Sequence, residues 1–102
     1  MKLPTQIENI PDLKLLRKGK QYKVYQVSGL NGMRMPQHIS THEAILIVLE
    51  GSAKLEIDNT IQNLNQGDVF VIPGCVVHSL TILEKFKSLV IMDLTSSIEF
   101  TN

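Results

Sequence analysis

Three histidines are the residues of this chain with the clearest chemical potential: His38, His42 and His78. Neutral imidazole binds transition metals and exchanges protons near neutral pH. His38 and His42 share parity, so an unbroken strand would point both side chains to one side. His78 follows a Pro-Gly pair that would start a later strand at the same rim. If all three converge, they predict a three-histidine zinc or iron site with a vacancy for water.

Three further residues are candidates for a ligand pocket around these histidines. Ser40 lies between His38 and His42 on the same predicted strand face. Arg34 shares the parity of His38, and its planar guanidinium would suit an anionic ligand. Cys75 lies near the start of the His78 strand, where its thiol is either a soft ligand or a small buried side chain.

Short strand-like runs separated by turn residues must position these side chains. The runs alternate between Val, Ile, Leu, Tyr or Phe and polar residues, which predicts an antiparallel β-sandwich or barrel. Gly51-Ser52 is predicted to be a tight turn, and residues 12–17, which follow Pro11, are predicted to form a short helical turn. The predicted strands cover 22–28, 33–40, 43–50, 53–58, 61–64, 68–72, 76–83 and 88–94.

Two of these runs, 44–49 and 69–72, are apolar without alternation. A strand with one solvent-exposed face should alternate between apolar and polar residues, so both faces of these two runs are expected to be covered. Two interpretations remain open here. Either a second copy of the chain covers the outer face, giving a homodimer, or two sheets of the same chain cover each other.

Net charge, cysteine count and the length of the apolar runs narrow the classes of protein to which this chain can belong. The formal net charge is zero, which gives no overall field for nucleic acid or an anionic membrane, although residues 1–36 are basic and the remainder is acidic. The basic run 13–23 is an alternative anion-binding or interaction surface. With one cysteine the chain cannot form an internal disulfide, and no apolar run is long enough to span a bilayer. We therefore expect a cytoplasmic protein without nucleic-acid or membrane partners.

Two segments resemble the two sequence motifs of the cupin family. Residues 32–51 (GMRMPQHISTHEAILIVLEG) follow the first motif, in which glycine precedes two histidines, a Glu or Gln and a second glycine. Residues 67–78 (GDVFVIPGCVVH) follow the second motif, which joins glycine, proline, glycine and histidine. The chain is thus identified as resembling a small single-domain cupin. The resemblance implies an all-β fold, an antiparallel jelly-roll barrel with an interior pocket, commonly in a homodimer.

The resemblance also implies a metal site that this sequence keeps only in part. His38 and His78 match two family ligands of Fe, Mn, Ni or Zn, whereas Ser40 and Ala44 replace the second histidine and the Glu or Gln. Cys75 replaces the glycine of the second motif. We expect a single domain over 1–102, with an arm over 1–19, a barrel over 20–94 and a tail over 95–102. The expected function is non-catalytic small-molecule binding, and the alternative is a metal-dependent dioxygenase or isomerase using His38, His42 and His78.

Overall fold

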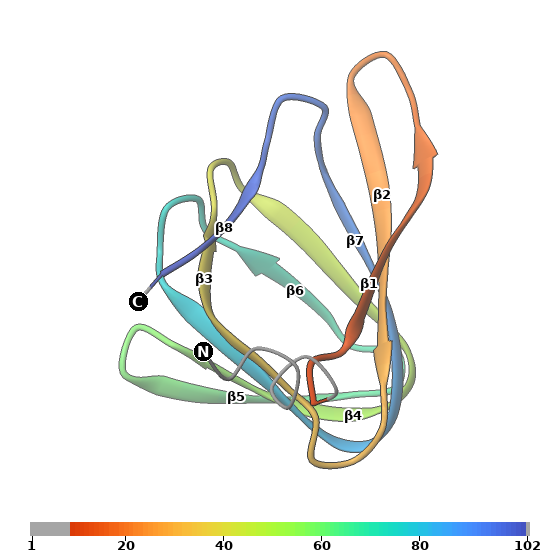
Figure 1. Ribbon diagram of the computed structural model, residues 1–102, viewed down its shortest axis with the longest axis vertical. Coiled ribbons are helices and arrows are strands. Elements are labelled where there is room, and N and C mark those ends of the chain that lie inside the picture. Colours follow the sequence, from red (N-terminus) through yellow and green to blue (C-terminus); the bar gives the residue numbers. More distant parts are fainter. Residues whose placement is uncertain (1–8, 102) are drawn as a thin grey trace.

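The computed structural model describes residues 9–101, and this part of the chain is all β (Figure 1). The prediction of an antiparallel all-β fold is confirmed. Eight strands follow one another without an intervening helix: β1 (Asp12–Lys18), β2 (Tyr22–Gly29), β3 (Arg34–Ser40), β4 (Ala44–Ile57), β5 (Thr60–Asn65), β6 (Val69–Ile72), β7 (His78–Asp93) and β8 (Ile98–Phe100).

The predicted helical turn over residues 12–17 is wrong, because this segment forms β1. Leu13 and Leu15 alternate with charged residues and lie opposite Val27 and Tyr25 of β2. This period of two is typical of a strand. Pairing with β2 also gives the main-chain groups hydrogen-bond partners that one isolated helical turn would largely lack.

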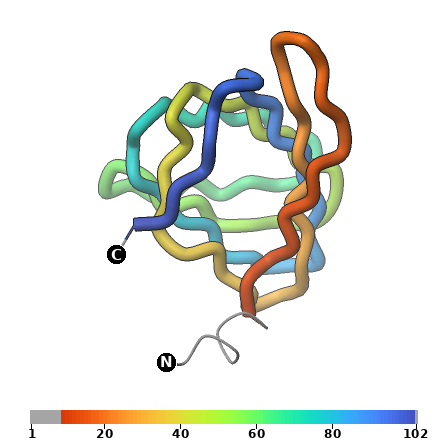
Figure 2. Tube along the Cα trace, turned by 45° about the horizontal axis from the view of Figure 1, so that its top comes forward, coloured from red at the N-terminus to blue at the C-terminus, as the bar shows by residue number. Residues whose placement is uncertain are grey.

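Two long strands, β4 and β7, give the molecule its curled shape. They pair with each other along almost their whole length. In one half of the molecule β7 also pairs with β2, and β4 with β6; with β1 these strands form what we call the first layer. In the other half β7 pairs with β3 and β4 with β5; with β8 they form the second layer. Figure 2 shows the trace curling around a common interior, consistent with a jelly-roll barrel.

Gly51 lies where β4 passes from one layer to the other. The predicted turn at Gly51-Ser52 is wrong in that the strand bends there and continues. The pairing of β4 with β7 shifts register around this point. Gly51 has a φ of 75°, and an added Cβ would lie 1.8 Å from the Lys85 carbonyl oxygen. Only glycine permits this backbone shape and this close approach.

A tight turn closes the β4–β5 hairpin. Asp58 and Asn59 have φ values of 53° and 61°. Two consecutive positive φ angles define the two-residue turn that best matches the twist of paired strands, and Asp and Asn tolerate it better than most residues.

The inner faces of both layers form one apolar core. Burial of each large aliphatic side chain contributes about 1.5–3 kcal/mol, so these faces supply most of the driving force for folding. The buried apolar residues are Val27, Met35, Ala44, Leu46, Val48, Ala53, Leu55, Ile57, Leu64, Ile72, Leu80, Ile82, Phe86, Val90 and Met92.

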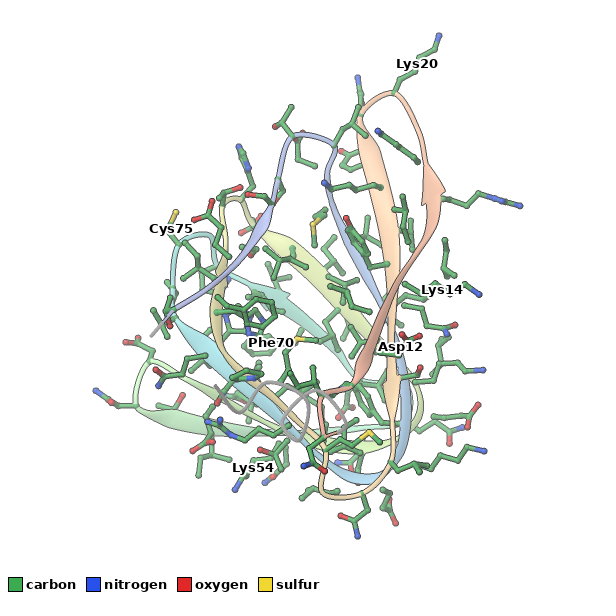
Figure 3. The ribbon with its side chains drawn as sticks, viewed as in Figure 1. Asp12, Lys14, Lys20, Lys54, Phe70 and Cys75 are labelled. Carbon is green, nitrogen blue, oxygen red and sulfur yellow. The ribbon has the colours of Figure 1, made fainter. Side chains whose placement is uncertain are left out.

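The segments predicted as an arm and a tail both contribute strands. β1 pairs with β2, and β8 pairs with β3. The β1–β2 hairpin carries most of the basic run 13–23 and projects beyond the rest of the molecule, with Lys20 at its tip (Figure 3). Within residues 9–101, no helix has the length and hydropathy required to cross a membrane.

Candidate functional site

An interior cavity lies between the two layers. Its volume is about 40 Å³. Among residues 9–101, three polar side chains line it: His38, Ser40 and His78. All three are buried, with exposed fractions of 6%, 4% and 5%. The rest of the lining is aliphatic or thioether: Leu13, Val27, Met35, Ala44, Leu46, Leu55, Ile72, Leu80, Val90, Met92 and Ile98.

A bulge in β3 turns His38 into this cavity. Met35 lies opposite Leu80 and His38 opposite His78, so Pro36 and Gln37 of β3 together face one residue of β7, Ser79. Pro36, which cannot donate to the ladder, lies in the extra stretch. Met35 and His38 therefore both face inward although their numbers differ in parity.

The two histidines form a contacting pair. Their ring centroids are 4.2 Å apart and the rings are inclined at 62°. His38 Nδ1 lies 2.6 Å from the Pro36 carbonyl oxygen, and His78 Nδ1 lies 2.9 Å from the Val76 carbonyl oxygen. A carbonyl oxygen only accepts, so both Nδ1 atoms carry the proton and donate it. In the neutral rings, each Nε2 is consequently an unprotonated acceptor or metal ligand.

Burial keeps both imidazoles neutral. Desolvation is the main cause that lowers the pKa of His38 to about 4, and the neighbouring His78 lowers it further, against the opposing hydrogen bond to Pro36. Desolvation likewise lowers the pKa of His78, against the hydrogen bond to Val76. At neutral pH the cavity therefore presents two uncharged nitrogen lone pairs.

His42 does not join the pair. β3 ends at Ser40, so the alternation that predicted a shared face stops before His42, which is exposed. Its carbonyl accepts from Ser40 Oγ at 2.9 Å and its amide lies 3.3 Å from Ser96 Oγ. Its Nδ1 lies 3.2 Å from Thr41 Oγ1.

Arg34 lies outside the interior cavity. Because of the bulge in β3, Met35 faces inward and Arg34 faces outward. Arg34 lines an outer cleft of about 570 Å³ formed by β3, the β4–β5 hairpin and the start of β7. His78 lines this cleft as well as the interior cavity, so this residue lies between the two spaces.

Cys75 also lies outside the cavity. It is exposed in the β6–β7 loop, and its side chain points away from the body of the molecule (Figure 3). Its amide donates to the Ser40 carbonyl at 2.8 Å, and its φ is 62°. The family glycine that Cys75 replaces thus corresponds to a left-handed backbone position, where a Cβ is unfavourable.

Sequence reasoning did not assign Met92 or Phe100 to this site. Met35 and Met92 line the cavity. Phe100 of β8 lies opposite His38, with its ring centroid 5.4 Å from the imidazole. The bulge that aims Met35 inward has one signal in the sequence, Pro36 inside a strand.

The chain belongs to the cupin family. The family model described as a cupin domain matches residues 30–94. No curated protein sequence matches the chain. Solved structures share the fold, among them a cupin superfamily protein from Desulfitobacterium hafniense, with 20% identity and a TM-score of 0.76 over 84% of this chain and 79% of that one.

Two further structures show how widely the fold is used. A conserved protein with a double-stranded β-helix domain from Klebsiella pneumoniae has 16% identity and a TM-score of 0.79, over 90% of this chain and 80% of that one. A DMSP lyase from Ruegeria pomeroyi has 22% identity and a TM-score of 0.79, over 90% of this chain and 52% of that one. At these identities the comparisons establish the fold and leave the activity open.

The described residues do not fit the divalent metal set of the family. The Ser40 hydroxyl donates to the His42 carbonyl, and Ala44 offers only a methyl group to the cavity. Within residues 9–101, no group of three or more His, Cys, Asp or Glu side chains is placed to hold a metal ion.

Proposed function

We propose that this cupin binds a small uncharged molecule inside the barrel and has no catalytic activity of its own. The observation that carries the proposal is the buried pair of neutral histidines in an otherwise apolar cavity. Both Nε2 atoms accept hydrogen bonds, so the ligand supplies an N–H or O–H donor. In the described part of the chain no charged residue lines the cavity, so a charged ligand would lose its hydration without gaining a partner.

The size of the cavity sets a second condition on the ligand. A volume of about 40 Å³ has room for roughly three water molecules. A larger ligand enters only if side chains move, and the flexible thioethers of Met35 and Met92 are suited to such movement. These conditions favour a compact molecule with one donor and a small apolar body.

A matched pair of probes tests this proposal. Pyrazole has an N–H donor, whereas 1-methylpyrazole is similar in shape and has none. In NMR titrations we expect pyrazole to shift the resonances of cavity residues such as Leu46 and Leu80, and 1-methylpyrazole to bind at least about tenfold more weakly, because it leaves buried acceptors unpaired. His38→Phe should abolish pyrazole binding, whereas His42→Ala, which alters an exposed histidine, should not. Equal binding of both probes, or no binding of either, would contradict the proposal.

The alternative is a metal-dependent dioxygenase or isomerase using His38, His42 and His78. The observation in its favour is that two histidines already converge with free Nε2 atoms. It requires the His42 side chain to turn inward from its exposed position. Near-stoichiometric Fe, Mn, Ni or Zn in protein purified without chelator, lost in His42→Ala, would support this alternative over simple ligand binding.

We also propose that the protein is a homodimer. The support is the outer apolar face of the first layer, which consists of Val24, Ile45, Ile47, Leu49, Val69, Val71, Leu89 and Ile91. These residues lie in adjoining register rows; Val71, Ile45, Ile91 and Val24 form one such row across four strands. Val69 and Val71 are 61% and 49% exposed. A second copy would cover this face and remove it from water.

A further inference from the structure

The outer cleft is a second space with room for a ligand, on the opposite side of the second layer from the interior cavity. Its volume of about 570 Å³ lies within the roughly 300–1,000 Å³ that is usual for small-molecule sites. The start of β7 forms its floor, β3 one wall and the β4–β5 hairpin the other wall (Figure 1). Ser79, which is only 3% exposed, lies on this floor.

The two walls carry opposite charges. Arg34 of β3 lies opposite Thr81 of β7, and Glu56 of β4 lies opposite Ser79. Neighbouring strands are about 4.8 Å apart, so the main chains of β3 and β4 are separated by roughly 10 Å across the floor. Both charged side chains are exposed, and within residues 9–101 no ion pair joins them. A ligand that enters the cleft therefore meets a cation on one side and an anion on the other.

The negative wall also has apolar neighbours. The Ser79 hydroxyl donates to Glu56 Oε1 at 3.4 Å, which holds this carboxylate over the floor. Asp58 of the adjoining turn lines the same wall and adds a second negative charge. Ile61 of β5 lies opposite Glu56 and is 56% exposed, and Val77 of the cleft lining is 42% exposed. An aliphatic group attached beside a bound ammonium group would therefore contact apolar surface.

These charges discriminate between classes of ligand. A simple anion would be attracted by Arg34 but repelled by Glu56 and Asp58, and a simple cation would experience the reverse. A zwitterion matches both walls. Its carboxylate accepts hydrogen bonds from the planar guanidinium group, and its ammonium group donates to the glutamate.

We propose that the outer cleft binds a free amino acid with an aliphatic side chain. Its carboxylate contacts Arg34, its ammonium group contacts Glu56, and its side chain packs against Ile61 and Val77. The inference does not rest on the ligand proposed for the interior, because the two spaces are lined by different residues apart from His78.

Three probes of similar shape test the roles of the two charges. Leucine carries both charges, 4-methylpentanoate lacks the ammonium group, and 3-methylbutylamine lacks the carboxylate. In NMR titrations of the full chain we expect leucine to shift the amide resonances of Val77 and Ser79. Leucine should bind about fivefold more tightly than either analogue, because each analogue loses one charge pair with an exposed side chain.

Two variants separate the contributions of the walls. In Arg34→Gln, leucine should bind no more tightly than 3-methylbutylamine, because its carboxylate has lost its partner, and its advantage over 4-methylpentanoate should remain. In Glu56→Gln, the advantage over 4-methylpentanoate should shrink and the advantage over 3-methylbutylamine should remain. Arg17→Gln on β1 and Glu43→Gln just before β4 are matched in type, lie outside the cleft lining and should change neither advantage.

Several results would overturn the inference. Equal binding of leucine and 3-methylbutylamine by the unaltered chain would indicate a site for amines, and equal binding of leucine and 4-methylpentanoate would indicate a simple anion site. The absence of any shift in the cleft at millimolar leucine, or equal effects of Arg17→Gln and Arg34→Gln, would also contradict it. Leucine binding by a protein that does not bind pyrazole would refute the proposed function alone, and the reverse result would refute the cleft site alone.

Discussion

The two halves of β4 carry opposite outer surfaces. Over residues 44–49 every side chain is apolar, and Ile45 and Leu49 are exposed at 40% and 41%. Over 53–57 the same strand alternates, with Ala53, Leu55 and Ile57 buried and Lys54 and Glu56 on the outside. The strand β4 thus belongs to both layers. Its outer face is apolar in the first layer, where burial against another surface is favourable, and polar in the second.

The interiors of the two layers differ as well. The buried histidine pair belongs to the second layer, through β3 and the first residues of β7. Most inward side chains of the first layer are apolar, and the polar ones include Ser88, whose exposed fraction is 0%, and Lys23, which lies opposite Met92 and donates to the Ser96 carbonyl. The half of β4 that lies in the layer of the histidine pair is therefore polar on the outside, whereas β4 and β6 in the first layer are apolar on the outside. This separation suits a protein that binds ligand with one layer and a partner with the other.

Gly51→Ala should have the largest effect, because it obstructs the bend that joins the layers. The new Cβ would lie 1.8 Å from the Lys85 carbonyl oxygen, at a φ of 75°. We expect a loss of about 3–5 kcal/mol in the free energy of unfolding, from overlap and backbone strain together. Gly67→Ala is the control: its φ is 89° but nothing lies within 4 Å of the added Cβ, so about 1 kcal/mol should be lost. Urea titrations giving equal losses would show that the bend tolerates a side chain.

Lowering the pH should have the next largest effect on the free energy of unfolding, through the buried histidines of the second layer. The folded pKa of His38, about 4, lies below its ordinary value of 6.5, so between these values the unfolded chain binds more protons. Stability conferred by neutral His38 is therefore complete above pH 6.5 and declines as pH falls towards 4, by up to about 3 kcal/mol. The lowered pKa of His78 acts in the same direction. Urea titrations of metal-free protein should show this slope reduced in His38→Gln and unchanged in His42→Ala.

A charge on the outer face of the first layer should dissociate the proposed homodimer. Ile45→Lys places an ammonium group in the centre of the outer apolar face, beside Val71 and Ile91. We expect the dissociation constant to rise at least about 30-fold, as for a central interface residue. Ile61→Lys on β5 is matched in type and is 56% exposed in the second layer, where no change is expected. Sedimentation equilibrium measures both, and a wild-type protein that stays monomeric at high micromolar concentration would refute the dimer.

Cys75→Gly should have the smallest effect and the opposite sign. Cys75 occupies a φ of 62° in the loop that leads from the first layer to the second. Glycine removes the strain of a left-handed backbone, so we expect a gain of about 1 kcal/mol in the free energy of unfolding. Cys75→Ser keeps a Cβ and should give no gain. Thermal unfolding under reducing conditions distinguishes the two variants.

The fold could be predicted from the sequence because turns and strand periods are local signals. The two glycine-containing motifs located both His38 and His78, and the missing alternation over 44–49 marked the layer with an apolar outside. The orientations of Arg34 and His42 could not be obtained by counting parity. A bulge at Pro36 reverses the orientation of Arg34 relative to His38. The end of β3 at Ser40 interrupts the alternation before it reaches His42. The bulge depends on pairing with β7 and the end of the strand on pairing with β8, and no single segment encodes such pairing.

Because β4 and β7 belong to both layers, they also limit how a ligand can enter or leave the interior cavity. Because β4 and β7 run continuously through both layers, the layers cannot separate without breaking the long hydrogen-bond ladder between these two strands. β8, by contrast, is held to β3 over three residues and places Phe100 against His38. Separating this three-residue strand from β3 breaks fewer ladder hydrogen bonds than opening β4 from β7, so it is the less costly way to uncover His38. We therefore expect a ligand to reach the interior at the β8 edge, with β4 and β7 remaining paired.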